Sequence, residues 1–264
     1  MRFAVILNPD GVATETLEKL NTTLSALNII YDCASLNDKN ADSLIEKSDL
    51  VLALGGDGTI IHTAKRAALS GKKVLGINCG HLGYNAGLEI DELDMLTHLK
   101  TGEYKTDRRM MLKVTVDNAV YYCVNDAVVC KGALSRMIKI TTHIGGAVMN
   151  YRSDGLIFST PTGSTAYSLS AGGPIIDPTL QSVVITPICA HSLFDRPLVI
   201  NPDTEIVVTI DEQSGNDTYL TIDGETAVPL NSKSKVVIER SEITADIIKI
   251  KNDGFLQILK QKIK

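Results

Sequence analysis

The chain has 264 residues, enough for about two domains with apolar cores that need no disulfide or metal to stabilise them. Hydrophobic residues make up 44% and charged residues 22% of the chain, which is typical of a globular protein and argues against disorder. The net charge of −5 and the sequence pI of about 5.6 argue against a broad nucleic-acid-binding surface, so any anionic ligand must meet local groups.

Residues 1 to about 100 alternate strand-like and helix-like patterns, which favours a parallel sheet covered by helices. The predicted strands are 3–7, 29–32, 50–54 and 74–77. Leucines at helical spacing predict buried helix faces, and the last of these helices ends before Gly102. These leucines are Leu17, Leu20, Leu24 and Leu27, then Leu93, Leu96 and Leu99.

Beyond Lys105 the pattern changes to strands separated by turns, so this part of the chain is predicted to be mostly β. The predicted strands are 112–116, 120–124, 137–140, 206–210 and 236–239. The last residues alternate apolar and basic side chains and predict a strand followed by a solvated basic tail. We therefore expect an α/β domain over residues 1–102, a β-rich domain over 103–246 and a C-terminal segment over 247–264.

Five cysteines, an odd number without a C-x-x-C pair, indicate neither a disulfide framework nor a zinc site. The apolar run near the amino terminus is too short for a signal peptide, and no segment approaches the roughly 20 apolar residues of a membrane helix. These features predict a cytoplasmic protein with no membrane partner.

The segment Gly55-Gly56-Asp57-Gly58-Thr59 lies between a strand-like run and a helix-like pattern. Its glycines let the backbone approach a bulky ligand, and the N–H groups that open the helix at Thr59 can bind phosphate oxygens. Asp57 would repel phosphate unless it binds Mg²⁺ or accepts a proton from an attacking hydroxyl. The alternative is a tight turn in which Asp57 caps the helix.

A second unusual segment, residues 159–174, combines many hydroxyl side chains with Pro and Gly. Short polar groups of this kind suit a loop that surrounds a sugar or a nucleotide. Apolar runs at 156–158 and 174–176 flank the segment, which argues against a flexible linker.

These segments, taken in order, resemble the NAD kinases over nearly the whole length of the chain. The GGDGT turn alone is weakly specific, because phosphofructokinases and diacylglycerol-type lipid kinases have similar turns, whereas the run from Thr160 to Ser168 is much more specific. The matching motifs are 55–59, Gly76-Ile77-Asn78 with 80–84, Asn125-Asp126, Arg152-Ser153-Asp154-Gly155, 160–174 and Arg196-Pro197-Leu198-Val199.

The resemblance implies an NAD kinase/diacylglycerol kinase-like fold and transfer of a phosphoryl group to the adenosine 2′-hydroxyl of NAD, giving NADP. It implies that Asp57 accepts the hydroxyl proton, with Gly58 lining the same turn. Asn125 and Asp126 would hydrogen-bond ribose hydroxyls, although many relatives have the longer Glu at the second position. Further nucleotide contacts are expected from Thr165, Ala166, Tyr167, Ser168, Leu169 and Ser170, with Tyr167 able to stack on a ring.

Other residues are carried over on weaker local matches. Arg152 and Asp154 would contact the nicotinamide side or a neighbouring subunit, and an exposed ion pair is the alternative for each. Arg136 and His62 are further candidates, although His62 can equally face solvent. Cys189 lies where the family places backbone contacts from an adjacent subunit, and a free buried cysteine is the alternative.

The resemblance also implies ATP, another nucleoside triphosphate or inorganic polyphosphate as the donor, a divalent cation that is most simply Mg²⁺, and a homotetramer. Few side chains of this sequence can ligate the cation, so we expect donor phosphates and water to hold it, and no metal ligand is named.

Three other kinds of nucleotide protein fit the sequence less well. A Walker-type kinase needs G-x-x-x-x-G-K-[ST], and a Rossmann dehydrogenase needs G-x-G-x-x-G after its first strand; neither pattern is present. A lipid kinase shares the GGDGT turn, but the hydroxyl-rich loop suits a sugar better than an acyl chain. A non-catalytic nucleotide sensor on the same fold remains the alternative from a different class.

Overall fold

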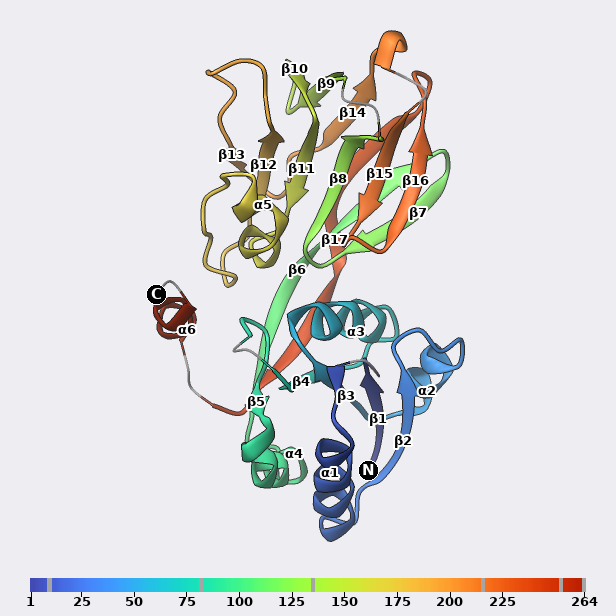
Figure 1. Ribbon diagram of the computed structural model, residues 1–264, viewed down its shortest axis with the longest axis vertical. Coiled ribbons are helices and arrows are strands. Elements are labelled where there is room, and N and C mark those ends of the chain that lie inside the picture. The colour runs from blue at the N-terminus through green and yellow to red at the C-terminus, as the bar shows by residue number, and fades with distance from the viewer. Residues whose placement is uncertain (9–10, 81–82, 134–135, 215–216, 252–253, 263–264) are drawn as a thin grey trace. The chain divides into compact units, whose positions relative to one another are not determined.

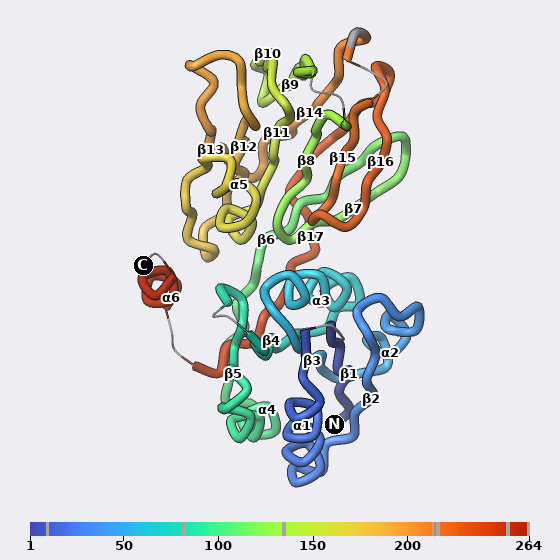
Figure 2. The backbone as a smooth tube through the Cα atoms, viewed as in Figure 1, coloured from blue at the N-terminus to red at the C-terminus, as the bar shows by residue number. Residues whose placement is uncertain are grey.

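The computed structural model in Figure 1 describes residues 1–8, 11–80, 83–133, 136–214, 217–251 and 254–262. The chain forms two compact units, which are considered separately below. Unit 1 contains Met1–Arg109 and Thr244–Lys264, and unit 2 contains Met110–Ile243. Figure 2 traces the red C-terminal segment back to the unit that holds the blue N-terminal strands.

Unit 1 is built on a parallel sheet with the strand order β2-β1-β3-β4. The strands are β1 (Arg2–Leu7), β2 (Ile30–Ser35), β3 (Leu50–Gly55) and β4 (Val74–Asn78), with β5 (Leu88–Glu89) and the end of β17 (Lys235–Lys249) beside β4. Every residue of β3 is buried, as expected for a central strand covered on both faces.

The helices of unit 1 follow the strands in alternation. They are α1 (Thr14–Ala26), α2 (Ala41–Lys47), α3 (Asp57–Leu69), the 3₁₀-helix η2 (Ile90–Leu96), α4 (Thr97–Thr101) and α6 (Phe255–Lys262). Of the leucines predicted to face the core, Leu20, Leu24, Leu93, Leu96 and Leu99 are buried, while Leu17 and Leu27 are partly buried. Their burial against the sheet explains the helical spacing in the sequence.

Unit 2 contains two antiparallel layers with a shared apolar core. One sheet has the order β13-β12-β11-β8-β15-β16. Its strands are β8 (Asp126–Lys131), β11 (Gly155–Ser159), β12 (Val183–Ile188), β13 (Leu198–Ile200), β15 (Thr218–Ile222) and β16 (Thr226–Leu230).

The other layer of unit 2 joins β10, β9, β14 and the first part of β17, with β6 and β7 forming a hairpin. These strands are β6 (Lys105–Val116), β7 (Ala119–Cys123), β9 (Ile138–Ile144), β10 (Ala147–Ser153) and β14 (Ile206–Ile210). In the described part of unit 2, short helices lie between strands: η3 (Thr162–Thr165), α5 (Tyr167–Ser170) and η4 (Glu212–Ser214). Alternate residues of β14 are buried, as expected for a strand with one face against the core.

The predicted fold class, an α/β part followed by a mostly β part, is confirmed. The prediction of a solvated basic tail is wrong, because residues 255–262 form α6. Its half-buried residues are Phe255, Ile258, Leu259 and Lys262, which lie at i, i+3, i+4 and i+7 on one helical face. The basic residues between them obscured this short periodicity.

Candidate functional site

The carboxyl end of β3 lies where the direction of strand addition reverses, because β1 has β2 on one side and β3 on the other. Ligands of open α/β sheets bind at such a point. Gly55 ends β3, Gly56 is the N-cap of α3, and Asp57 is the first residue of the helix. The predicted order of strand, glycine turn and helix is therefore confirmed.

The carboxylate of Asp57 is bound by the loop that follows β4. Its Oδ2 accepts the N–H of Tyr84 at 2.9 Å, and its Oδ1 accepts the N–H and the side-chain amide of Asn85 at 2.9 and 3.3 Å. A Cβ on Gly83 would lie 2.7 Å from Oδ1, so a larger residue here would displace the carboxylate from its present position. Asp57 makes no side-chain hydrogen bond that caps α3, and the helix-cap alternative is wrong.

Helix α6 supplies a cation to the same carboxylate. The Nζ of Lys262 lies 3.2 Å from Oδ2 of Asp57 and 3.7 Å from the ring centroid of Tyr84. The rings of Tyr84 and Phe255 contact each other with centroids 6.3 Å apart. The sequence analysis missed Lys262, because nothing local in the sequence connects it with residues near Asp57.

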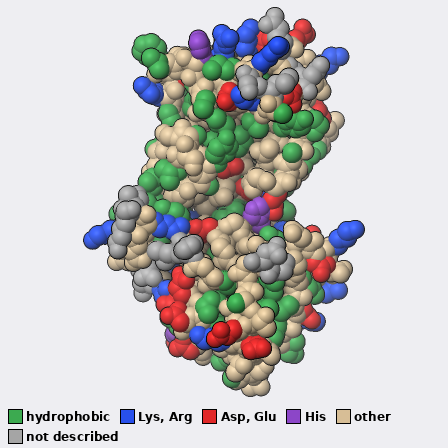
Figure 3. Space-filling model, in the orientation of Figure 1, with side chains coloured by type: hydrophobic (Ala, Val, Ile, Leu, Met, Phe, Trp, Pro, Cys, Tyr) green, Lys and Arg blue, Asp and Glu red, His purple; other side chains and the backbone are tan. Residues whose placement is uncertain are grey.

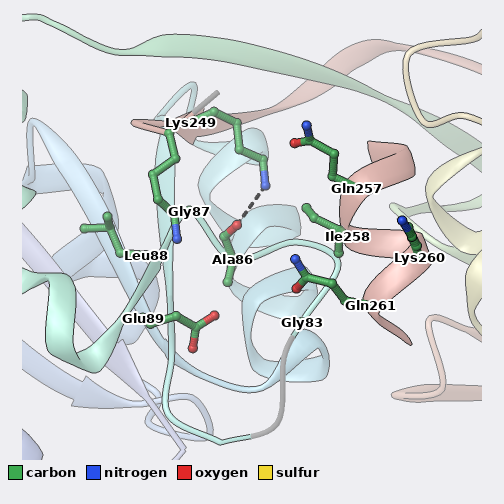
Figure 4. Close-up of a pocket in the computed structure, with 11 residues that line it drawn as sticks. Gly83, Ala86, Gly87, Leu88, Glu89, Lys249, Gln257, Ile258, Lys260 and Gln261 are labelled. Carbon is green, nitrogen blue, oxygen red and sulfur yellow. Dashed lines mark hydrogen bonds between the residues drawn. The ribbon is translucent and has the colours of Figure 1, made fainter. Parts of the chain in front are cut away.

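A cavity of about 650 Å³ lies beside this loop, with α6 as one wall (Figure 4). Lys249 points into the loop and donates to the carbonyl oxygens of Ala86 at 2.9 Å and Asn85 at 3.4 Å. Burial lowers the pKa of Lys249 to about 8, with a further contribution from the positive charge of Arg109. The lining residues are Gly83, Ala86, Gly87, Leu88, Glu89, Lys249, Lys251, Gln257, Ile258, Lys260 and Gln261.

In unit 2, the candidate ribose-binding residues Asn125 and Asp126 are held by the carboxylate of Asp223, which the sequence analysis did not identify. Asp223 accepts the backbone N–H groups of Val124, Asn125 and Asp126 at 3.1, 2.8 and 3.2 Å. Asp126 is only 5% exposed, and this burial, with the nearby charge of Asp223, raises its pKa to about 7. Asp223 and Gly224 have φ of +48° and +71° in the β15–β16 turn, so the Asp-Gly dipeptide was the available signal.

Several hydroxyls of the segment 159–174 hold the loop itself. Thr160 Oγ1 donates to Val124 O at 2.6 Å and accepts the N–H of Gly163 at 3.1 Å. Ser164 Oγ accepts the N–H of Ile176 at 3.0 Å. Ser168 is fully buried, its hydroxyl hydrogen-bonds that of Thr186 at 2.8 Å, and its carbonyl oxygen accepts the N–H of Gly173 at 2.8 Å, so Ser168 holds the loop rather than facing a ligand.

The remaining candidates in this loop face outward. Thr165 and Ala166 are half-buried, whereas Tyr167, Leu169 and Ser170 are exposed. The pKa of Tyr167 is raised by desolvation first and then by nearby acidic groups. Those groups are Cys130, Cys189, Asp126 and Asp154, so three segments of unit 2 converge around the phenol: β8, the turn between β10 and β11, and the residues after β12.

The site residues that were predicted from weaker local matches differ in exposure and in their contacts. Asp154 forms an ion pair with Lys131 at 2.8 Å rather than with Arg152, which is exposed. Arg136 is exposed, and His62 is half-buried on α3. Cys189 is exposed, with φ of +48°, so the alternative of a buried thiol is wrong.

The described part of the chain offers no cluster of His, Cys and carboxylate ligands for a metal ion. Within it, no three His, Cys, Asp or Glu side chains are grouped closely enough to ligate a cation. The described helices also include none long and apolar enough to span a membrane.

Acidic and basic side chains both occur on the face drawn in Figure 3.

Two family profiles match this chain. Residues 7–104 match the ATP-NAD kinase N-terminal domain, and residues 124–250 match the ATP-NAD kinase C-terminal domain. The chain is 40% identical over 232 residues to the NAD kinase of Caldanaerobacter subterraneus subsp. tengcongensis, covering 85% of this chain and 82% of that protein. It is 39% identical over 240 residues to the NAD kinase of Carboxydothermus hydrogenoformans, covering 88% and 85%.

Two crystal structures share the fold. An Archaeoglobus fulgidus NAD kinase in complex with ATP superposes with a TM-score of 0.80 and 23% identity, covering 100% of this chain and 98% of that one. Yeast NADH kinase complexed with NADH gives a TM-score of 0.85 and 22% identity, covering 100% and 87%. At this level of identity the two likenesses support the fold alone.

Proposed function

The chain belongs to the NAD kinase family and phosphorylates NAD to NADP, and we propose that Asp57 accepts the proton of the adenosine 2′-hydroxyl in this reaction. The observation that supports this role is the binding of the Asp57 carboxylate by Tyr84, Asn85 and Lys262 at the carboxyl end of β3. These donors hold the carboxylate in a fixed orientation, which a general base needs in order to accept the proton of a bound hydroxyl.

In the proposed step, the 2′-oxygen of NAD bonds to the terminal phosphorus of the donor. The bond from that phosphorus to its bridging oxygen breaks, and the leaving phosphate keeps the electron pair. The hydroxyl proton passes to Asp57. Asn125 and Asp126 hydrogen-bond the ribose, and Thr165, Ala166, Tyr167 and Ser170 contact the nucleotide.

The phosphoryl donor is proposed to be ATP or inorganic polyphosphate, with its phosphates on the first N–H groups of α3. These groups precede the first helical bond, from the N–H of Ile60 to Gly56 O, and have no partner within the helix. Mg²⁺ would enter with the donor and offset the charge of its phosphates, since the described residues supply no set of three ligands.

The first test is NADP formation by purified protein with NAD and Mg²⁺, with ATP and polyphosphate offered separately. We expect NADP from at least one donor, and the comparison identifies which. NAD binding without NADP from either donor would instead favour the nucleotide-sensor alternative.

The second test is Asp57→Asn, which keeps the size of the side chain but removes its basicity. Loss of a general base costs about a hundred-fold to ten-thousand-fold in rate, so turnover should fall by that factor. Circular dichroism and NAD affinity should stay close to those of the unaltered protein. Near-full turnover in this variant would contradict the role of Asp57.

A further inference from the structure

Lys262 occupies the last hydrogen-bonding position of Asp57. An ionised carboxylate offers about four lone-pair sites. Among the described residues, Oδ1 accepts two donors from Asn85, and Oδ2 accepts the N–H of Tyr84 and the ammonium of Lys262. With all four donors in place, Asp57 has no site left for the proton of a substrate hydroxyl, so one donor must leave before Asp57 can act as proposed above.

The donor best able to leave is Lys262. Asn85 is buried, and the N–H groups of Tyr84 and Asn85 belong to the backbone of a loop that Lys249 also binds. Helix α6 has no fully buried residue, and the Lys262 side chain is 22% exposed. A partly exposed ion pair contributes little to stability, so its exchange for another anion costs little.

The anion that can draw Lys262 away is the phosphate chain of the donor. Asp57 is the first residue of α3, so phosphates bound to the N–H groups of Gly58 and Thr59 would lie next to its carboxylate. Two adjacent anions repel each other unless a cation lies between them. The ammonium of Lys262 lies 3.2 Å from Oδ2 of Asp57, beside the residue that begins α3.

We propose that Lys262 is a catalytic residue that binds the donor phosphates, and that its ion pair with Asp57 is the resting position it leaves when the donor binds. The proposal rests on the role of Asp57 given above. The exchange frees Oδ2 to accept the 2′-hydroxyl proton and places a positive charge beside the phosphoryl group during transfer. The enzyme thus exposes its base only when a donor is present.

The kinetic test is Lys262→Met, which keeps the length of the side chain and removes the charge. We expect the KM for ATP to rise and kcat to fall, lowering kcat/KM for ATP about a hundred-fold, while the KM for NAD changes little. Lys262→Arg should recover much of the loss. Lys47→Met, which alters an exposed lysine of α2 outside the cavity lining, is the matched control and should behave like the unaltered enzyme. Unchanged or increased kcat/KM for ATP in Lys262→Met, as a purely inhibitory contact predicts, would overturn the proposal.

A binding measurement tests the exchange without catalysis. In Asp57→Asn, the ammonium of Lys262 has no carboxylate to leave before it binds the phosphates. Lys262→Met should therefore weaken ATP binding more in the Asp57→Asn variant than in the protein that keeps Asp57. Calorimetric titration with ATP of the unaltered protein, Asp57→Asn, Lys262→Met and the variant with both changes gives this difference. Equal weakening in both backgrounds would overturn the exchange.

The two proposals fail in different ways. Turnover retained by Asp57→Asn contradicts the proposed base. An inactive Asp57→Asn together with a fully active Lys262→Met leaves the base in place and removes only the proposed role of Lys262.

Discussion

Two carboxylates of the candidate sites lie in opposite environments. Asp57 has a side chain that is 32% exposed and surrounded by hydrogen-bond donors, including an ammonium. Asp126 is buried next to a second carboxylate, Asp223. Asp223 accepts hydrogen bonds from three backbone N–H groups at and just before the start of β8. The surroundings of Asp126 therefore favour its neutral form.

Asp126 should make stability depend on pH. Its pKa is about 7 in the folded protein against a reference of 3.8, so the folded state binds the proton more tightly than the unfolded state. The stabilisation is fully present below about pH 4 and is lost as the pH rises to 7. Asp126→Asn should therefore lose less stability than the unaltered protein between pH 5 and pH 7.5. Urea midpoints followed by circular dichroism measure the difference.

The control for this pH effect is Asp91→Asn, which alters an exposed carboxylate of η2 and should leave the pH dependence as it is. If Asp126→Asn shows the same loss between the two pH values as the unaltered protein, the raised pKa of Asp126 is contradicted.

At the scale of elements, the candidate nucleotide loop is held to the start of β8 by backbone contact. Gly163 lies directly against the carbonyl of Asn125, and the N–H of Thr160 donates to the same oxygen at 2.9 Å. A Cβ at Gly163 would overlap this carbonyl, which belongs to the backbone and cannot rotate away. Glycine is therefore required at position 163, because the candidate nucleotide loop approaches the backbone of Asn125 closely at this point.

Gly163→Ala should destabilise the protein by about 1–3 kcal/mol, the usual cost of forcing an additional carbon into a packed interior. It should also weaken NAD binding, since the same loop carries the exposed candidates Tyr167, Leu169 and Ser170. Urea denaturation and calorimetric titration measure the two effects. Gly254→Ala is the control, because no atom lies within 4 Å of a Cβ at that position. Equal stability of the two variants would contradict the close approach.

At the scale of the whole molecule, exposed apolar side chains in unit 2 are a candidate contact for the homotetramer that the family resemblance implies. Phe194 is 93% and Leu193 81% exposed, and both lie in the segment between β12 and β13. Large apolar side chains exposed side by side are typical of a protein–protein interface. We therefore propose that this segment contacts another copy of the chain.

Light scattering after gel filtration should give a mass about four times the 28.5 kDa of one chain. Phe194→Glu should lower this mass, because a charge cannot be buried in an apolar interface without a large cost. Ile30→Glu, which alters an exposed apolar residue of unit 1, should leave it unchanged. A single-chain mass for the unaltered protein would contradict the tetramer.

The predictable part of the fold depended on short-range patterns. The alternation of apolar strands and leucine-spaced helices in the first hundred residues predicted β1 to β4, α1 and the helix before Gly102, because each such element must bury one face. The GGDGT turn predicted the strand–turn–helix arrangement at Asp57, since each of these elements is local. Residues 255–262 were predicted wrongly, because two turns of helix give too few apolar positions to distinguish from a tail.

The sequence by itself determined the fold class, the family and the motifs in which the candidate residues lie, because strand, helix and turn signals extend over only a few neighbouring residues. Only the tertiary structure decided which groups meet. Lys262 reaches Asp57 across 205 positions, and Asp223 binds the N–H of Asn125 across 98. No local periodicity encodes such contacts, since they depend on strand order, register and the path of the chain between them.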